Sequence, residues 1–229
     1  MTTIRENYAR ITDDIAKSAA KSGRNFEDIE LVAVTKFVDV ERIAEAIEAG
    51  AYSIGENRVQ EFLAKRDFFN EKCVRKNIIG QLQTNKVKYV VGEVDIIQSV
   101  DRMELALAIS KRASALLMTQ RILIEVNIGD EPQKGGIALS SVFDLIREIS
   151  ALPNIKVCGL MCIPPMLGEA GLRNCFKSMR ELFLSIGESG MENVSMDILS
   201  MGMSSDYKIA IEEGANMVRV GSALFGPRN

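Results

Sequence analysis

From residue 30 to the end of the chain, short apolar runs alternate with longer helical segments, and this alternation restricts the fold more than any other feature. Runs rich in Val, Ile and Leu predict strands at 30–36, 51–54, 77–80, 94–98, 121–127, 155–161, 195–199 and 216–220. The segments between them predict helices at 39–49, 57–72, 84–91, 101–116, 138–151, 169–189 and 204–213. Strands separated by helices favour a parallel sheet with right-handed crossovers, and eight of them favour a closed barrel. We therefore predict an α/β fold, a single (β/α)8 TIM-type barrel over about residues 30–226.

An additional helix is predicted before the barrel, over about residues 3–22. Ile4, Tyr8, Ile11 and Ile15 are spaced by three or four residues, as on one face of an amphipathic helix.

Several helix ends carry recognisable signals. Asp101 and Ser204 are candidate N-caps, and Gly50, Gly190 and Gly214 stand where helices should end. No linker rich in Pro, Gly or Ser interrupts the pattern, so we expect residues 1–229 to form a single domain.

The composition limits the classes of partner. A net charge of −3 gives no general electrostatic reason to bind nucleic acid or an anionic membrane. No apolar run approaches the eighteen or so residues of a membrane span, and the first eight residues lack the apolar core of a secretory signal. We expect a cytoplasmic, monomeric protein without a nucleic-acid or membrane partner.

The cysteines and the missing histidines exclude several chemistries. The 4 cysteines show no paired framework for disulfides, which predicts thiols in a reducing compartment. Cys158 and Cys162 lie four residues apart, but without histidine or a second cysteine pair we expect no zinc site. The absence of histidine also removes every Ser–His or Cys–His nucleophile pair.

Lys36 ends the first apolar run, directly before a helical segment. An unpaired ammonium is costly to bury, so the position makes sense if the strand opens onto a cavity where the amine reacts. Neutral lysine forms Schiff bases with carbonyls, including that of pyridoxal phosphate. The alternative is that Lys36 extends from the strand end into water.

The last two strands end in residues suited to a phosphate. In such barrels the active site lies at the carboxyl ends of the strands, and a phosphate site often follows strands seven and eight. Ser204 could cap a helix and bind an anion, Gly221 allows a close backbone approach, and Ser222 adds a donor. These residues could equally make only tight turns and a helix cap.

Two further polar residues have open interpretations. Arg219 lies inside the last apolar run, where it could pair with a barrel carboxylate or face the ring nitrogen of a pyridine cofactor. Asn57 could bind a cofactor substituent or cap the helix that it starts.

Other basic residues are predicted to lie at the surface. Seven of them between Lys65 and Lys88 are interspersed with acids, which favours a solvated helix face over a polyanion-binding patch. Lys134, in the polar loop 129–136, could help to transfer a ligand, but a plain surface lysine is the simpler interpretation.

Six segments together resemble the signatures of the pyridoxal phosphate homeostasis protein family, single-domain relatives of the barrel domain of alanine racemases. They are 33–36, 55–61, 79–86, 159–161, 199–206 and 218–226. The resemblance implies a barrel that binds pyridoxal 5′-phosphate (PLP) as a Schiff base on Lys36. It also implies that Ser204, Gly221 and Ser222 hold the phosphate and that Arg219 faces the pyridine nitrogen. Asn57 completes the predicted cofactor-binding residues.

Members of the family are thought to bind, store or deliver PLP, with PLP-dependent apoenzymes as possible recipients. The chain departs from the usual pattern at Asn77-Ile78, where the family often has histidine, and at Phe37-Val38, where it often has lysine and proline. We predict a carrier or regulatory protein involved in intracellular PLP (vitamin B6) homeostasis, not an enzyme.

Two alternatives remain at this stage. An amino-acid racemase of the alanine racemase type would need a second base opposite the lysine, a tyrosine that in those enzymes comes with an additional β-domain. The chain ends at Asn229, soon after the eighth predicted strand, so we expect no such domain. A barrel enzyme with a phosphorylated substrate and an aldolase-like Schiff base would explain Lys36 and Arg219 together less well.

Overall fold

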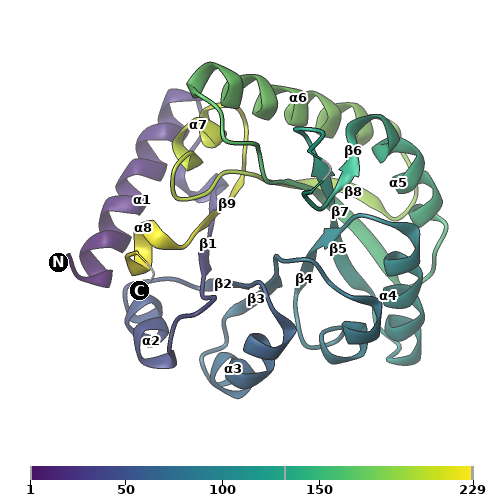
Figure 1. Cartoon of the computed structure of the whole chain (residues 1–229), viewed down its shortest axis with the longest axis horizontal. Coiled ribbons are helices and arrows are strands. Elements are labelled where there is room, and N and C mark those ends of the chain that lie inside the picture. Colours follow the sequence, from purple (N-terminus) through teal and green to yellow (C-terminus); the bar gives the residue numbers. More distant parts are fainter. Residues whose placement is uncertain (1, 132, 228–229) are drawn as a thin grey trace.

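A closed parallel barrel organises the protein, seen end-on in Figure 1. The computed structural model describes residues 2–131 and 133–227. Its barrel strands are β1 (Glu30–Val34), β2 (Ser53–Glu56), β3 (Arg75–Ile78), β4 (Ile96–Val100), β5 (Gln120–Asn127), β7 (Ile155–Cys162), β8 (Val194–Ser200) and β9 (Met217–Val220). They pair in that order, and the β1–β9 pairing completes the circle. The two-residue strand β6 (Ile137–Ala138) adds to the carboxyl end of β5.

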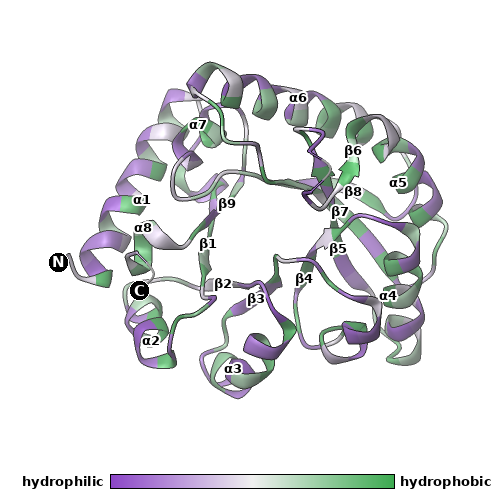
Figure 2. Ribbon diagram, viewed as in Figure 1, coloured by the Kyte–Doolittle hydropathy of each residue, from purple (hydrophilic) through white to green (hydrophobic). Residues whose placement is uncertain are grey.

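Helices surround the barrel and bury their apolar sides against it (Figure 2). They are α1 (Ile4–Lys21), α2 (Val40–Glu48), α3 (Val59–Glu71), α4 (Met103–Ala115), α5 (Val142–Ser150), α6 (Glu169–Gly187), α7 (Tyr207–Glu212) and α8 (Ser222–Phe225). The predicted barrel and N-terminal helix are therefore confirmed. Thr3 and Glu6 form a capping box that starts α1, which packs against α7 and α8.

The described residues also contain the short 3₁₀ segments η1 (Phe26–Asp28), η2 (Thr84–Tyr89) and η3 (Leu139–Ser141). The helix predicted over 84–91 is the 3₁₀ helix η2 and not an α-helix, because bonds such as that from Lys86 N to Gln83 O (2.9 Å) wind this segment more tightly.

Two predicted N-caps were also wrong. Arg102, not Asp101, precedes α4, and Asp101 pairs instead with the Arg102 guanidinium at 2.6 Å. The helix expected from residue 204 begins only at Tyr207, since Asp206 Oδ1 accepts the N–H of Met203 at 2.6 Å and holds residues 203–206 in a turn. Gly50 and Gly214 do follow helix ends, with φ of 118° and 110° that favour glycine.

The barrel interior is filled by an apolar layer below the carboxyl ends of the strands. Val32, Ile96, Leu123, Cys158, Met161, Ile198 and Met217 form this cluster. Successive side chains along a strand point to opposite faces of the sheet. The strand residues that do not point into the barrel therefore pack outward against the helices. Above this cluster, at the strand ends, lies the space where the site residues gather.

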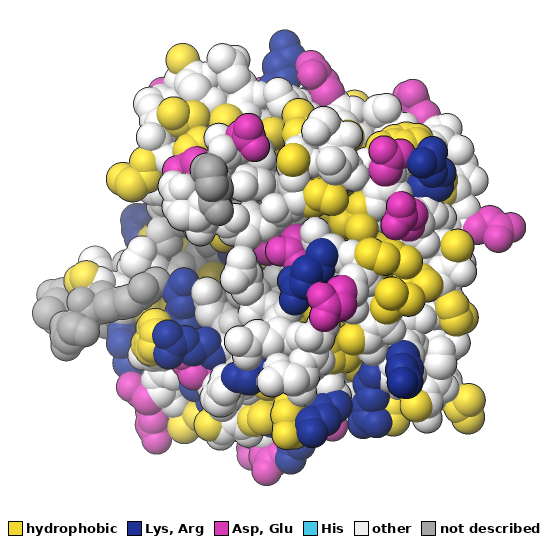
Figure 3. All heavy atoms as spheres, turned by 45° about the vertical axis from the view of Figure 1, so that its right-hand side comes forward, with side chains coloured by type: hydrophobic (Ala, Val, Ile, Leu, Met, Phe, Trp, Pro, Cys, Tyr) yellow, Lys and Arg dark blue, Asp and Glu magenta, His cyan; other side chains and the backbone are white. Residues whose placement is uncertain are grey.

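The surface mixes charges. Figure 3 shows basic, acidic and apolar side chains interspersed over one face of the molecule. Within residues 2–131 and 133–227, no helix is long and apolar enough to cross a membrane. The same residues contain no cluster of three or more His, Cys, Asp or Glu suited to a metal ion.

Candidate functional site

A cavity of about 290 Å³ opens at the carboxyl ends of the strands, and every predicted site residue lines it: Lys36, Asn57, Ser204, Arg219, Gly221 and Ser222. Five further residues complete the lining: Val34, Ile79, Ile163, Met203 and Ser205. The cavity therefore combines an amine, a guanidinium and hydroxyl groups with an apolar wall.

Lys36 does not end β1, contrary to the sequence-based prediction. The strand ends at Val34, and Lys36 lies half-buried in the turn that follows. Phe37, with φ of 60°, reverses the chain direction there. A second cavity, of about 220 Å³, shares Lys36 and Gly221 with the first and extends to Arg42 and Phe225. Lys36 thus borders two adjoining cavities.

Ser204 connects the last two strand-end loops. Its Oγ accepts the backbone N–H groups of Gly221 and Ala223, each at 3.2 Å, rather than capping its own helix. The N–H of Gly221 is consequently used within the protein. The Ser204 hydroxyl hydrogen still has to be donated, and the cavity is where an acceptor could lie.

Arg219 is 3% exposed and is held by neutral partners. One terminal nitrogen donates to Ser200 Oγ at 2.7 Å, and the other donates to the carbonyl of Cys162 at 2.8 Å. Among the described residues no carboxylate forms an ion pair with it, so the alternative of a barrel ion pair is not found. Burial lowers the pKa of the guanidinium, while the nearby Cys162, Glu125 and Asp206 act in the opposite direction.

A chain of buried hydrogen bonds across the barrel interior holds the Ser200 side chain in place. Ser200 Oγ donates to Gln98 Oε1 at 2.8 Å, and Gln98 Nε2 donates to Asn77 Oδ1 at 3.0 Å. Asn77 Nδ2 in turn donates to Ser53 Oγ at 3.0 Å. The asparagine at a position where the resembled family often has histidine thus serves as a link between two strands.

One polar atom of Asn57 has no partner among the residues that the structure describes. Its Oδ1 is buried and accepts no hydrogen bond from any of them. The cap interpretation was wrong, since α3 begins at Val59 with Arg58 as its N-cap. Gly80 allows the loop after β3 to approach closely, because a Cβ there would lie 2.4 Å from the Asn57 carbonyl oxygen.

Glu125, an acidic residue inside the barrel, was not among the predicted site residues. It is 6% exposed, and its Oε2 has no hydrogen-bond partner in the described part of the chain. Burial raises the pKa of this carboxyl to about 7; Asp101 adds to the increase and Arg219 opposes it. Glu125 could have been found from the sequence, because it is an acidic residue within an otherwise largely apolar predicted strand.

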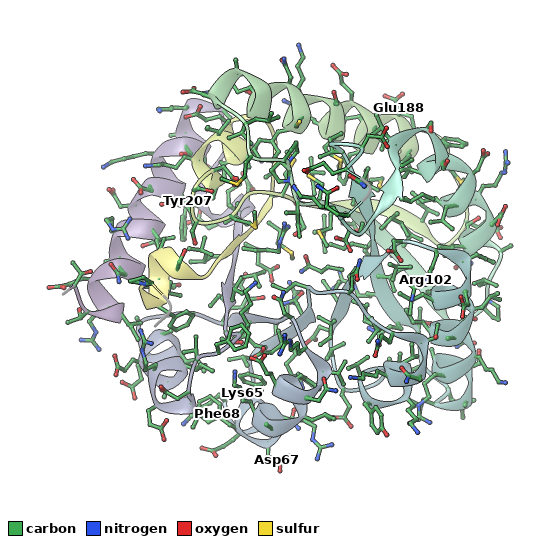
Figure 4. The ribbon with its side chains drawn as sticks, viewed as in Figure 1. Lys65, Asp67, Phe68, Arg102, Glu188 and Tyr207 are labelled. Carbon is green, nitrogen blue, oxygen red and sulfur yellow. The ribbon has the colours of Figure 1, made fainter. Side chains whose placement is uncertain are left out.

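Lys65 was predicted on a solvated helix face, and this was wrong. Its side chain is only 12% exposed and forms a 2.8 Å ion pair with Glu56, which is fully buried. Burial raises the pKa of Glu56, and the hydrogen bonds from Lys65 and Thr35 oppose that increase. Lys65 therefore points inward from α3, as Figure 4 shows.

The remaining candidates lie outside the cavity lining. Lys134 pairs with Glu131 and donates to the Pro164 carbonyl at 3.1 Å. All cysteines are thiols, and burial raises the pKa of Cys162 to about 12. Cys158 and Cys162 form no metal cluster with other described residues.

The fold and the cavity define a class of protein: a (β/α)8 barrel that presents a lysine amine and serine hydroxyls at the carboxyl end of its strands. The profile described as "Alanine racemase, N-terminal domain" matches residues 5–229. The chain is 43% identical over 224 residues to the pyridoxal phosphate homeostasis protein of Aquifex aeolicus, covering 97% of each chain. It belongs to the pyridoxal phosphate homeostasis protein family.

Solved structures agree with this assignment. PipY of Synechococcus elongatus, determined with PLP bound, has a TM-score of 0.82 and 32% identity, with 93% of this chain and 100% of PipY covered. Alanine racemase from Corynebacterium glutamicum has a TM-score of 0.70 at 15% identity, with 93% of this chain and 59% of the racemase covered. The second likeness concerns the fold alone.

Proposed function

We propose that this chain binds PLP as a Schiff base on Lys36 and takes part in intracellular PLP homeostasis, without robust catalysis. The observation that carries the proposal is that six residues at or near the carboxyl ends of four strands line one cavity. The amine, the guanidinium and the hydroxyls come together only because parallel strands end at one edge of the barrel.

The donor set fits the chemical groups of PLP. The Lys36 amine would hold the cofactor through its aldehyde, by a condensation in which a C=N bond forms and the carbonyl oxygen leaves as water. Ser204 and Ser222 offer hydroxyl donors to a phosphate, and Gly221 keeps the backbone close. Asn57 Oδ1 is a buried acceptor that lacks a partner among the described residues, which suits a ring hydroxyl.

Arg219 would face the ring nitrogen. A guanidinium only donates hydrogen bonds, so it favours an unprotonated pyridine nitrogen. Such a ring withdraws electrons weakly, which supports a holding role over turnover. Val34, Ile79 and Ile163 would exclude water from the ring.

Relatives support the same role. The Aquifex aeolicus protein carries the name pyridoxal phosphate homeostasis protein, and PipY was solved with PLP bound. We extend PLP binding to this chain on that basis and on the cavity residues.

The racemase alternative is less well supported. Two opposed proton-transfer groups are needed to racemise an α-carbon, and in the resembled enzymes the second is a tyrosine. Within the described residues, no tyrosine lines the cavity. Tyr207, for example, donates its hydroxyl hydrogen to Asp14 at 2.7 Å, between α7 and α1.

We further propose that residues 1–229 act as one PLP-binding domain, monomeric and cytoplasmic. PLP-dependent apoenzymes are the proposed recipients, because they consume the cofactor that such a carrier would hold.

Borohydride reduction tests the proposal. Purified protein incubated with PLP and then reduced should carry a stable adduct, and peptide mapping should find it on the peptide containing Lys36. Lys36→Ala should abolish the adduct. Retention of a stoichiometric adduct elsewhere in Lys36→Ala would overturn the assignment, and alanine turnover of about 1 s⁻¹ or more would favour the racemase.

A further inference from the structure

The turn that carries Lys36 is held on both sides by one helix. On the amino side, the carbonyl of Thr35 accepts a hydrogen bond from Lys65 Nζ at 2.8 Å. On the carboxyl side, the N–H of Phe37 donates to Glu61 Oε2 at 2.8 Å. These two atoms belong to the peptide groups that flank the Lys36 Cα. Both backbone connections of the proposed cofactor lysine are therefore tied to α3.

Helix geometry explains how one element makes both contacts. Glu61 and Lys65 are four residues apart on α3, so their side chains project from the same face about one turn apart. Figure 4 shows Lys65 on the barrel side of the helix and Asp67 on its outer side. We call Glu61 and Lys65 together the α3 clamp.

The Lys65 side of the clamp is anchored in the barrel wall. Besides Thr35, Lys65 Nζ binds Glu56 Oε1 at 2.8 Å, and the Thr35 hydroxyl donates to the same oxygen at 2.7 Å. Glu56 ends β2 and is fully buried. Because an unpaired buried charge is costly, Lys65 and Glu56 hold each other in place. The ammonium at Thr35 is thus a fixed point of the structure.

A third contact reinforces the carboxyl side. The Arg58 guanidinium lies 5.5 Å from the centre of the Phe37 ring. Phe37 has φ of 60°, an unusual value for a residue with a bulky side chain. The contacts from Glu61 and Arg58 stabilise that conformation.

We propose that Glu61 and Lys65 are positioning residues, which direct the Lys36 amine into the cavity by fixing the two peptide groups on either side of it. This inference rests on the proposed function, since it concerns the same lysine. Neither residue lines the 290 Å³ cavity, so the clamp acts through the backbone.

Orientation of this kind affects rate more than fold. A displacement of about 1 Å can slow a reaction by up to 10²-fold when the attacking atom must meet its target in a narrow range of directions. Loss of the Glu61 contact should therefore slow PLP capture by about tenfold to hundredfold. Glu61 is only partly buried, so its replacement should leave the barrel folded.

The experiment uses four variants of the full chain. Glu61→Ala removes one side of the clamp, and Glu61→Gln keeps an oxygen that can accept from Phe37. Glu56→Gln combined with Lys65→Met removes the other side without leaving a buried charge unpaired. Asp67→Ala is the matched control, because its side chain is 90% exposed on the same helix.

Two measurements are made on each variant. Amide hydrogen exchange of Phe37 in the cofactor-free protein reports the clamp directly and requires no ligand. The rate of PLP capture, followed by absorbance and fixed with borohydride at intervals, reports the orientation of Lys36. We expect faster Phe37 exchange and slower capture in Glu61→Ala, partial rescue in Glu61→Gln, and wild-type values in Asp67→Ala.

The outcomes separate this inference from the proposed function. Capture by Glu61→Ala at the wild-type rate, with Phe37 exchange either changed or unchanged, overturns the positioning role. If the double variant fails to fold, the Glu61 variants still decide the question. If wild-type protein forms no adduct on Lys36 while Phe37 is protected through Glu61, the proposed function fails and the clamp remains only a structural contact, so the positioning role is overturned with it.

Discussion

Ser204 Oγ accepts the backbone N–H of Gly221 at 3.2 Å, and this bond ties the loop after β8 to the loop after β9. The same oxygen accepts from Ala223, so one hydroxyl organises the start of α8. Because both bonds use Ser204 as an acceptor, its own hydrogen can be donated to a phosphate in the cavity.

Replacement of this hydroxyl should weaken cofactor binding. Ser204→Ala removes a donor to the proposed phosphate and leaves two backbone N–H groups without their acceptor. A hydrogen bond to a charged group contributes about 1.5–3 kcal/mol, so we expect PLP affinity to fall roughly tenfold to hundredfold. Equilibrium dialysis measures this. Ser140→Ala, exposed on η3, is the control, and equal affinity in both variants would contradict the phosphate role.

Arg219→Lys should destabilise the barrel despite retaining the charge. Lysine lacks the planar fork that reaches both Ser200 Oγ and the Cys162 carbonyl. One buried acceptor then lacks its charged donor, at a cost of about 1–3 kcal/mol. Urea unfolding, with the slope compared between proteins, gives the free energy. A variant as stable as the wild type would show that these two bonds contribute little.

Glu125→Gln should change how stability depends on pH. The pKa of Glu125 is about 7 in the folded protein against an ordinary value of 4.5, so the folded state keeps a proton that the unfolded state has released between these values. The free energy of unfolding therefore falls as pH rises from about 4.5 to 7. Above pH 7 Glu125 is ionised in the folded protein as well, and the free energy of unfolding is then lower by about 3 kcal/mol at most.

The difference in free energy of unfolding between the wild type and Glu125→Gln separates the titration of Glu125 from that of the other carboxyl groups. Near pH 4 the two proteins should be of similar stability, and above pH 7 the variant should be the more stable. Thermal unfolding between pH 4 and 8 measures the difference. A constant difference over the whole range would mean that Glu125 does not titrate there.

Gly80→Ala should disturb the position of Asn57. An added Cβ would lie 2.4 Å from the Asn57 carbonyl oxygen and 2.9 Å from its Cα, so one of the two loops must move. We expect a loss of stability of about 1–3 kcal/mol together with weaker PLP binding. Gly168→Ala is a fair control, since a Cβ there meets nothing within 4 Å and its φ of −67° suits alanine. Equal effects of both substitutions would contradict the close approach.

The fold was predictable because its signal is local and repeated. Each strand is a short apolar run, and each helix shows apolar residues that recur every three or four positions. The alternation of the two implies a parallel barrel. Lys36, Ser204 and Arg219 could be selected for the same reason, since residues at the carboxyl ends of parallel strands share one edge. Asn57 and Gly221 follow from that rule too.

The contacts around the site were not predictable from local pattern. Lys65 has the sequence context of a surface lysine, yet it pairs with the buried Glu56 at the end of β2. Ser204 resembles a helix cap, yet it binds the next loop along the barrel. In each pair the two residues belong to different elements, and the distance between those elements in the folded barrel selects the partner, which the pattern of neither element reports.

The amino-acid sequence by itself determined the barrel, its N-terminal helix and the set of polar residues at the strand ends, because periodicity and residue type depend only on neighbours in the chain. Only the tertiary structure decided that Lys36 lies beyond β1 in a turn held by Glu61 and Lys65, and that Arg219 is bound by neutral partners. The physical reason is that burial and hydrogen-bond partners are set when the barrel closes and brings distant strands into contact.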